Sequence, residues 1–167
     1  MKTSIKPHIP LKQIQNKGII TGYASCFDKV DQQRDIIAKG AFSKTLRAWH
    51  LSGKKLKMLW QHQPHHPIGI WTHLRQDEYG LYVEGQLALG IAQADEAYLL
   101  LKKGLLDGLS IGFRTIEAVQ DISKKARLIL DIDLIEISLV TFGANSSATV
   151  QQVKFSDRYP VSRAIEC

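Results

Sequence analysis

Cysteine is scarce in this chain of 167 residues, and its two copies, Cys26 and Cys167, stand far apart. This spacing fits neither a zinc motif nor the framework of a disulfide-rich secreted domain. Long hydrophobic runs are also missing, since no stretch approaches the roughly 18 apolar residues that a membrane helix needs. The first residues, Met-Lys-Thr-Ser-Ile-Lys-Pro-His, lack the apolar segment of a signal peptide. We therefore expect a cytoplasmic protein that makes no membrane contact and has no disulfide.

The charge of the chain is basic, with a formal net charge of +6 and a pI near 9.3. A nucleic-acid-binding protein would concentrate such charge on one face or in a recognisable motif. Here the lysines and arginines occur in short groups with acidic residues between most of them, and no helix-turn-helix or RNA-binding motif is present. The pattern favours a solvated basic face, without a nucleic-acid partner, and would also suit an acidic protein partner.

One domain accounts for the length and for the ordinary composition, which is 44% hydrophobic and 23% charged. Residues 1–17 are predicted to be a flexible arm, 18–153 the folded domain and 154–167 an irregular tail. Within the domain, apolar spacing predicts helices over 42–53 and 92–103, each followed by or ending at a glycine. Residues 28–39 read as a polar loop, Pro64 and Pro67 as the borders of a turn, and 77–80 as a hairpin loop. Alternating residues predict strands over 18–27, 55–61, 68–75, 81–89, 109–116 and 126–142.

The last of these strands changes phase within its length. Leu128, Leu130, Ile132 and Leu134 share one face, and from Ile135 the apolar positions change to the other parity. A strand cannot exchange its faces without an irregularity, so we expect a bulge or bend near Leu134. Short strands with such bends and two helices predict an α+β domain, built as a mostly antiparallel closed β-barrel with peripheral helices.

The segment Gly-Leu-Ser-Ile-Gly at 108–112 matches the G-x-S-x-G pattern of a nucleophile elbow around Ser110. Two features exclude the α/β-hydrolase interpretation. That fold places its serine between a strand and a following helix, whereas Ser110 lies in a predicted strand that follows a helix. It also needs a histidine after the serine, and all six histidines of this chain precede Ser110. Other serine hydrolases use different chain orders, so Ser110 with Gly112 on the same strand face is still a candidate nucleophile in an open groove.

A serine nucleophile needs a base and a group that orients the base. His62 is the best-placed histidine, because it ends an alternating strand just before a proline-rich turn. Asp131, Asp133 and Glu136 are the candidates for the third member. Asp131 and Asp133 should face solvent, opposite the leucines of their strand. Glu136 instead has almost wholly apolar neighbours, where a carboxylate is costly unless it is paired.

A metal site is the alternative use of these histidines. His62, His65 and His66 form an H-x-x-H-H pattern that a zinc-dependent hydrolase could use. Zinc needs three or four supported ligands, no cysteine lies near, and the two prolines suggest that His65 and His66 point out of an exposed turn. Each residue taken alone also has an ordinary structural explanation, since a serine between glycines or a glutamate at a bulge is usually structural. We expect no metal and no cofactor.

Several segments, in this order, resemble the prohead (capsid maturation) proteases of tailed bacteriophages of the HK97 type. The resemblance extends over about residues 18–150, and its segments share short runs of glycine, aromatic and apolar residues: Gly22-Tyr23-Ala24, Asp35-Ile36-Ile37, Gly40-Ala41-Phe42, Trp60-Gln61-His62, Ile68-Gly69, the stretch 80–85, the stretch 108–113, the stretch 136–141 and Ala144-Asn145.

The resemblance implies a fold like that of the herpesvirus maturation protease (assemblin), a closed barrel ringed by helices. It also implies a serine endopeptidase with His62 as general base, Ser110 as nucleophile and Glu136 as the orienting residue. The family often has a proline before Ala-Asn, where this chain has Gly143. Backbone N–H groups around Gly143, Ala144 and Asn145, together with Gly112, are the expected oxyanion and substrate-binding groups.

The partners implied by the resemblance are the major capsid protein or its scaffolding domain, and the protease itself through self-processing and self-association. The expected location is the immature capsid (prohead) of a phage or prophage in the host cytoplasm. Two alternatives are left open at this point. One is an inactive barrel that acts as an assembly or scaffold protein, and the other is the zinc-dependent hydrolase.

Overall fold

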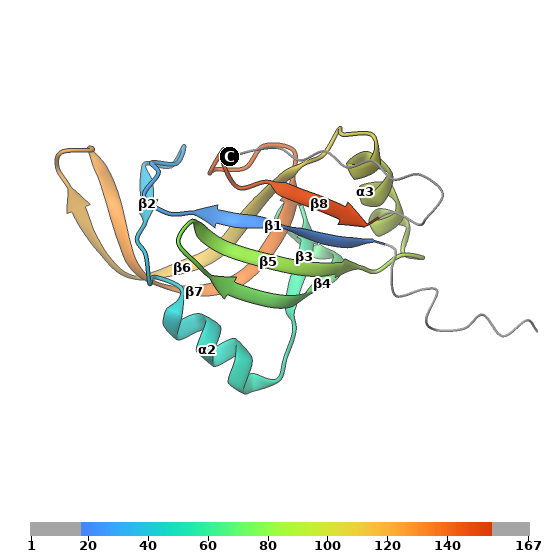
Figure 1. Cartoon of the computed structure of the whole chain (residues 1–167), viewed down its shortest axis with the longest axis horizontal. Coiled ribbons are helices and arrows are strands. Elements are labelled where there is room, and N and C mark those ends of the chain that lie inside the picture. Colours follow the sequence, from blue (N-terminus) through green and yellow to red (C-terminus); the bar gives the residue numbers. More distant parts are fainter. Residues whose placement is uncertain (1–17, 155–167) are drawn as a thin grey trace, which may run out of the picture.

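The computed structural model describes residues 18–154, which form eight strands and two helices (Figure 1). The predicted arm 1–17 and the tail lie outside the described residues, apart from Lys154, which ends the last strand. In chain order, the elements are β1 (Ile19–Cys26), β2 (Asp35–Ile37), α2 (Ser43–Ser52), β3 (Leu56–Trp60), β4 (Gln63–Gln76), β5 (Gly80–Leu87), α3 (Ala92–Lys102), β6 (Gly108–Asp121), β7 (Ala126–Val140) and β8 (Val150–Lys154).

All eight strands belong to one sheet with the order β2-β7-β3-β4-β5-β1-β8, and β6 pairs with β7. The expected antiparallel closed barrel is wrong in two respects. Both β2 and β3 run parallel to β7, so the sheet is mixed. It is also not closed, because β6 and β8 do not pair with each other as strands. The start of β6 meets the segment that leads into β8 through an isolated bridge between Gly108 and Thr149. Alternation along a strand reports which residues are buried but not the direction of the neighbouring strand, which explains the error.

Both predicted helices are present, and the first packs against the core by the predicted face of Phe42, Leu46 and Trp49. Helix α2 ends at Gly53, whose left-handed φ of 65° suits glycine. Trp49 of α2 donates its indole N–H to the Leu134 carbonyl at 2.9 Å and so fixes the helix against β7. Helix α3 buries Ala94, Ala97 and Leu101 and lies at the opposite end of the molecule from the tip of the β6–β7 ribbon (Figure 1).

The predicted turn at Pro64 and Pro67 is wrong, because both prolines lie within β4. The chain reverses two residues earlier, where Trp60 pairs with Gln63 across Gln61 and His62. These two residues have positive φ values of 50° and 59°. A two-residue hairpin turn that matches the strand twist requires positive φ at both positions and usually contains glycine or asparagine. Gln61-His62 carries no such signature, so the turn was missed.

The predicted irregularity in β7 is confirmed. Gly112 pairs with Glu136 and Phe113 with Leu134, so Ile135 is an extra residue on β7 and its side chain is 44% exposed. The predicted phase before the bulge is right for Ile132 and Leu134, which are buried, but wrong in the first part of the strand. Ile129 and Asp131 are buried, and Leu128 and Leu130 only partly so. Two further register shifts in β6, between Thr115 and Ala118, bend the β6–β7 pair and change the direction of its side chains there.

The segment 28–39 was predicted to be a polar loop, but it contains the buried strand β2. Strand β8 was not predicted either, since Val-Gln-Gln-Val-Lys has only two apolar residues. Both are short strands, and each is held by pairing with a longer strand, β7 or β1. Their formation therefore depends on tertiary partners more than on local pattern.

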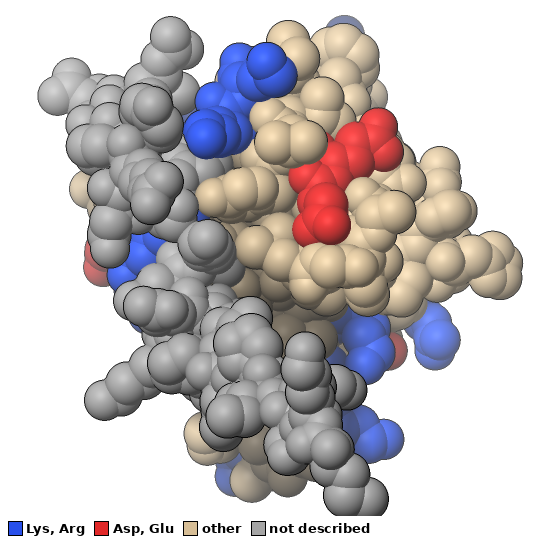
Figure 2. All heavy atoms as spheres, turned by 90° about the vertical axis from the view of Figure 1, so that its right-hand side faces the viewer, with Lys and Arg blue, Asp and Glu red and all other residues tan. Residues whose placement is uncertain are grey.

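Charged side chains are scattered over the visible face of the molecule, as they are along the sequence. On the face in Figure 2, the Lys and Arg side chains form separate small groups with uncharged surface and an acidic group between them. Within residues 18–154, neither helix is long and apolar enough to span a bilayer.

Candidate active site

His62 owes its position to the tight turn between β3 and β4. The Gln61 side chain holds this turn against the end of β7, donating to the Thr141 hydroxyl at 2.8 Å and accepting from the Thr141 N–H at 3.2 Å. The Gln61 N–H also donates to the Leu139 carbonyl at 2.9 Å. These bonds over-determine a strained backbone, and such strain is typical of functional residues.

Glu136 contacts the imidazole directly. Its Oε1 lies 2.6 Å from His62 Nδ1, and because a carboxylate only accepts, the Nδ1–H donates. Glu136 is 8% exposed, whereas the His62 side chain is 42% exposed. The second carboxylate oxygen, Oε2, accepts the hydroxyl hydrogen of Ser138 at 2.7 Å. The expectation that a carboxylate in this apolar segment must be paired is confirmed, and the partner is a histidine.

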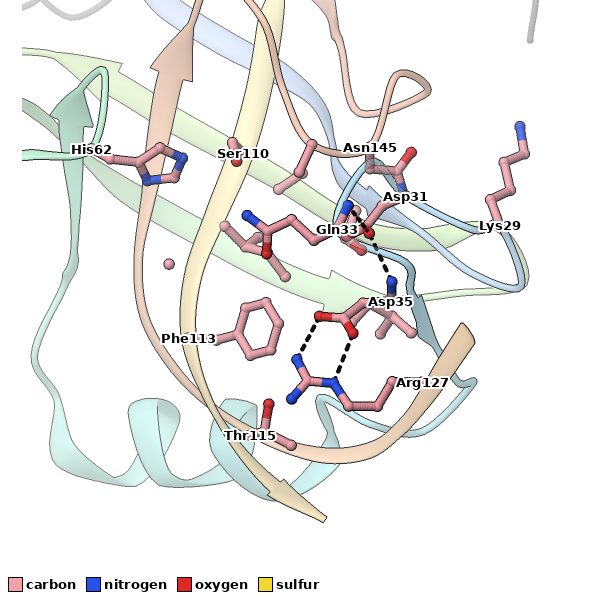
Figure 3. Close-up of a pocket in the computed structure, with 16 residues that line it drawn as sticks. Lys29, Asp31, Gln33, Asp35, His62, Ser110, Phe113, Thr115, Arg127 and Asn145 are labelled. Carbon is pink, nitrogen blue, oxygen red and sulfur yellow. Dashed lines mark hydrogen bonds and ion pairs between the residues drawn. The ribbon is translucent and has the colours of Figure 1, made fainter. Parts of the chain in front are cut away.

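Ser110 lies on β6 directly opposite Ser138 of β7, so the two side chains share one face of the sheet. It is 8% exposed and lines a pocket of about 350 Å³ together with His62. In Figure 3, the ring of His62 points toward Ser110 from the turn after β3. With Nδ1 bonded to Glu136, the other ring nitrogen, Nε2, is left to face the serine side.

Gly112 makes this arrangement possible by having no side chain. It pairs with Glu136 across the two strands, and a Cβ atom at this position would lie 2.2 Å from Glu136 Oε1. The carboxylate thus occupies the space in which any other residue at 112 would place its side chain. The second glycine of the G-x-S-x-G match has a clear role, although it is not that of a nucleophile elbow.

The segment after β7 closes one side of the pocket. Ala144 and Asn145 line it, while Gly143 packs against the backbone of Leu109, where a Cβ would lie 2.7 Å from the carbonyl oxygen. The side chain of Asn145 is used structurally, donating to the Cys26 carbonyl at 3.0 Å and accepting from the Ser147 N–H at 3.0 Å. Within the described chain, the N–H groups of Ala144 and Asn145 have no protein acceptor.

A neighbouring wall of the pocket was not anticipated from the sequence. It comes from the segment around β2, with Lys29, Asp31, Gln33 and Asp35. Asp35 forms two hydrogen bonds of 2.8 Å with Arg127 of β7, which are drawn in Figure 3. The Asp35 carboxylate raises the pKa of Arg127 above its usual value, so this guanidinium stays charged. The resemblance included Asp35-Ile36-Ile37 but implied no role for these residues in the site.

The remaining candidates lie elsewhere. Asp131 does not face solvent as predicted but is buried and paired with Lys44 at 2.7 Å, whereas Asp133 is exposed. Neither lines the pocket. His65 and His66 are exposed on β4. Among residues 18–154, no group of three histidine, cysteine or acidic side chains is arranged to hold a metal ion.

Solved structures with a similar fold include viral proteases. The chain aligns with the bacteriophage T4 capsid assembly protease, gp21, with a TM-score of 0.57 and 13% identity, over 73% of this chain and 81% of the other. It aligns with the KSHV protease in complex with a hexapeptide phosphonate inhibitor with a TM-score of 0.54 and 14% identity, over 79% of this chain and 63% of the other. The predicted likeness to the herpesvirus protease fold is therefore confirmed.

Sequence comparison defines the family. Residues 8–160 match the model of the caudovirus prohead serine proteases, and the chain belongs to this family. The prohead protease of Enterobacteria phage HK97 is 35% identical over 152 residues, which are 90% of this chain and 66% of that protein. The chain thus spans just under two thirds of the length of this relative. The resemblance expected from the motifs is confirmed.

Proposed function

We propose that this protein is a serine endopeptidase that cleaves the capsid or scaffold protein during phage prohead maturation. The observation that carries the proposal is the 2.6 Å contact between His62 Nδ1 and Glu136 Oε1, at a histidine that lines the same pocket as Ser110. A base held by a carboxylate next to a serine hydroxyl is the constellation of acyl transfer. Family membership supports the same reaction.

In the proposed mechanism, His62 Nε2 takes the hydroxyl proton as Ser110 Oγ bonds to the carbon of the scissile carbonyl. His62 then returns this proton to the leaving nitrogen as the peptide C–N bond breaks, and water hydrolyses the Ser110 ester by the same route. Glu136 keeps the Nδ1–H tautomer and stabilises the imidazolium that forms. The N–H groups of Ala144 and Asn145 are the proposed donors to the oxyanion, because they border the pocket and lack a protein acceptor.

The substrate is proposed to lie along β6. One edge of β6 pairs with β7. In the described residues, its other edge is bonded only at the start, where Gly108 bridges Thr149 and the Leu109 N–H donates to the Ala148 carbonyl. Beyond Ser110 this strand lines the pocket with Ile111, Gly112, Phe113 and Thr115. An extended peptide can add to such an edge through backbone hydrogen bonds. An unfolded scaffold segment or a chain terminus of a second copy could supply this extended peptide. The proposed place of cleavage is the prohead in the host cytoplasm.

Substitution of the nucleophile tests the function. We expect Ser110→Ala to abolish cleavage of the co-expressed capsid protein of the same phage, measured by the intact mass of every chain. The matched control is Ser25→Ala, since Ser25 is another buried serine that lines the same pocket. Wild type and Ser25→Ala should trim their substrate at the same discrete sites, and a fluorophosphonate should label Ser110 in both.

Two outcomes would contradict the proposal. If Ser110→Ala cleaves as wild type does, the serine mechanism is wrong. If purified proheads that contain the wild-type protein show neither cleavage nor labelling at Ser110, the protein acts in assembly without activity.

A further inference from the structure

We propose that Ser138 is a positioning residue of this site, a fourth member that fixes both His62 and Glu136. The proposal rests on the proposed function, because it assigns a role within the same site. Ser138 lies near the C-terminal end of β7, two residues after Glu136 and opposite Ser110, and it is fully buried at 0% exposure.

The hydroxyl of Ser138 contacts the site in two ways. It donates its hydrogen to Glu136 Oε2 at 2.7 Å and accepts the backbone N–H of His62 at 3.1 Å. A serine hydroxyl has one hydrogen, so the donor is fully used, and its direction is fixed by the carboxylate. The contact of Glu136 Oε1 with the imidazole completes a closed ring of three hydrogen bonds.

This ring explains how two mobile parts of the site are held. A carboxylate bonded through one oxygen alone could rotate, and the second bond, to Ser138, fixes the direction in which Oε1 faces Nδ1. The N–H of His62 belongs to a turn residue with a positive φ of 59°, which needs an external acceptor to stay in place. One hydroxyl therefore sets both the orientation of the carboxylate and the position of the base.

Ser138 is not placed to act as a second nucleophile. Its hydroxyl hydrogen is committed to Glu136, and its side chain has no solvent exposure, whereas Ser110 lines the pocket. A group that acts through His62 and Glu136 should affect the rate of the chemical step more than the binding of substrate.

The test compares Ser138→Ala with Thr45→Val. Thr45 is also a buried hydroxyl bonded to β7, accepting the Leu134 N–H at 3.0 Å, but it does not line the pocket. For Ser138→Ala we expect kcat on a peptide spanning a mapped cleavage site to fall by about ten- to a hundredfold, with KM changed less than about threefold. Thr45→Val should keep the wild-type kcat even where it melts at a lower temperature.

The second readout is the tautomer of His62, measured by ¹⁵N NMR of the imidazole nitrogens and assigned with His62→Gln. Wild type and Thr45→Val should show the Nδ1–H form, and Ser138→Ala a mixture of both tautomers. Wild-type ring signals together with wild-type kcat in Ser138→Ala would overturn the proposal. Equal losses of kcat in both variants, in step with stability, would overturn it as well, because they would indicate a structural role.

Failure of the proposed function gives a different result. In that case Ser110 is not labelled by the fluorophosphonate and Ser110→Ala has no effect on processing. The tautomer measurement needs no substrate, so it still decides whether Ser138 positions the His62–Glu136 pair.

Discussion

The glycine at position 112 contributes space to the site, and this space has a specific occupant. Glu136 Oε1 lies where a Cβ of residue 112 would be, at a separation of 2.2 Å. Non-bonded contacts as short as this do not occur, so in a variant with a side chain at position 112 either the carboxylate or the strand must move. Because Oε1 is also the atom that contacts His62 Nδ1, any movement acts directly on the base.

Gly112→Ala should therefore reduce cleavage more than it reduces stability. We expect a loss of about a hundredfold or more in kcat/KM, because the carboxylate no longer holds the imidazole tautomer. The overpacking itself should lower the free energy of unfolding by about 1–3 kcal/mol. Peptide cleavage and urea unfolding measure the two effects.

Gly85→Ala is the matched control for this variant. A Cβ at Gly85 would lie 2.6 Å from side-chain atoms of Met58 and Trp71 in the core, away from the pocket. It should lose comparable stability and keep its activity. Equal activity in the two variants would show that the space at Gly112 does not matter for the site.

Among the elements, the β4–β5 turn depends on one carboxylate. Asp77 Oδ1 accepts the N–H groups of Tyr79 and Gly80, and Oδ2 accepts the Tyr23 hydroxyl at 2.8 Å and Arg75 at 2.7 Å. Burial by itself would raise the pKa of Asp77, but these hydrogen bonds outweigh it and hold the pKa below its ordinary value. Burial and the Asp77 carboxylate together raise the pKa of Tyr23 to about 12.

This lowered pKa predicts how stability depends on pH. A carboxylate whose folded pKa is below its unfolded value stabilises the protein fully above about pH 4, and the contribution is lost as the pH falls through the folded pKa. We expect Asp77→Asn to cost about 1 kcal/mol at neutral pH, a modest value because the group is partly solvated. Thermal unfolding between pH 7 and pH 2 checks this, and the two proteins should converge at the acidic end. A constant difference over this range would contradict the assignment.

At the scale of the whole molecule, one ion pair joins the β2 segment to β7. Asp35 is 3% exposed and forms two hydrogen bonds with Arg127, and β2 pairs in parallel with β7 at the same place. Removal of one partner of a buried pair leaves an uncompensated charge. Because β2 carries a wall of the pocket, this pair connects the stability of the fold to the shape of the site.

Arg127→Ala should lower the free energy of unfolding by about 2 kcal/mol, less than for a fully buried pair because the Arg127 side chain is 47% exposed. The double variant Asp35→Ala/Arg127→Ala should recover part of this loss, since no buried carboxylate is left unpaired. Urea unfolding of the two variants and the wild type measures the difference. A double variant less stable than Arg127→Ala alone would show that the buried charge is not the cause.

The sequence by itself determined the helices, most strands, an irregularity near Leu134 and the need of Glu136 for a partner. These features follow from local periodicity, or from the cost of burying a carboxylate without a partner. That His62 is this partner was implied by the resemblance to the prohead proteases. The tertiary structure alone decided the parallel pairing of β2 and β3 with β7, the tight turn at Gln61-His62 and the role of Ser138. A three-residue strand has no periodicity of its own, and a buried serine gains a function only from the groups that the fold places around it. Neither property is encoded in the neighbouring residues, because both arise from contacts between segments far apart in the chain.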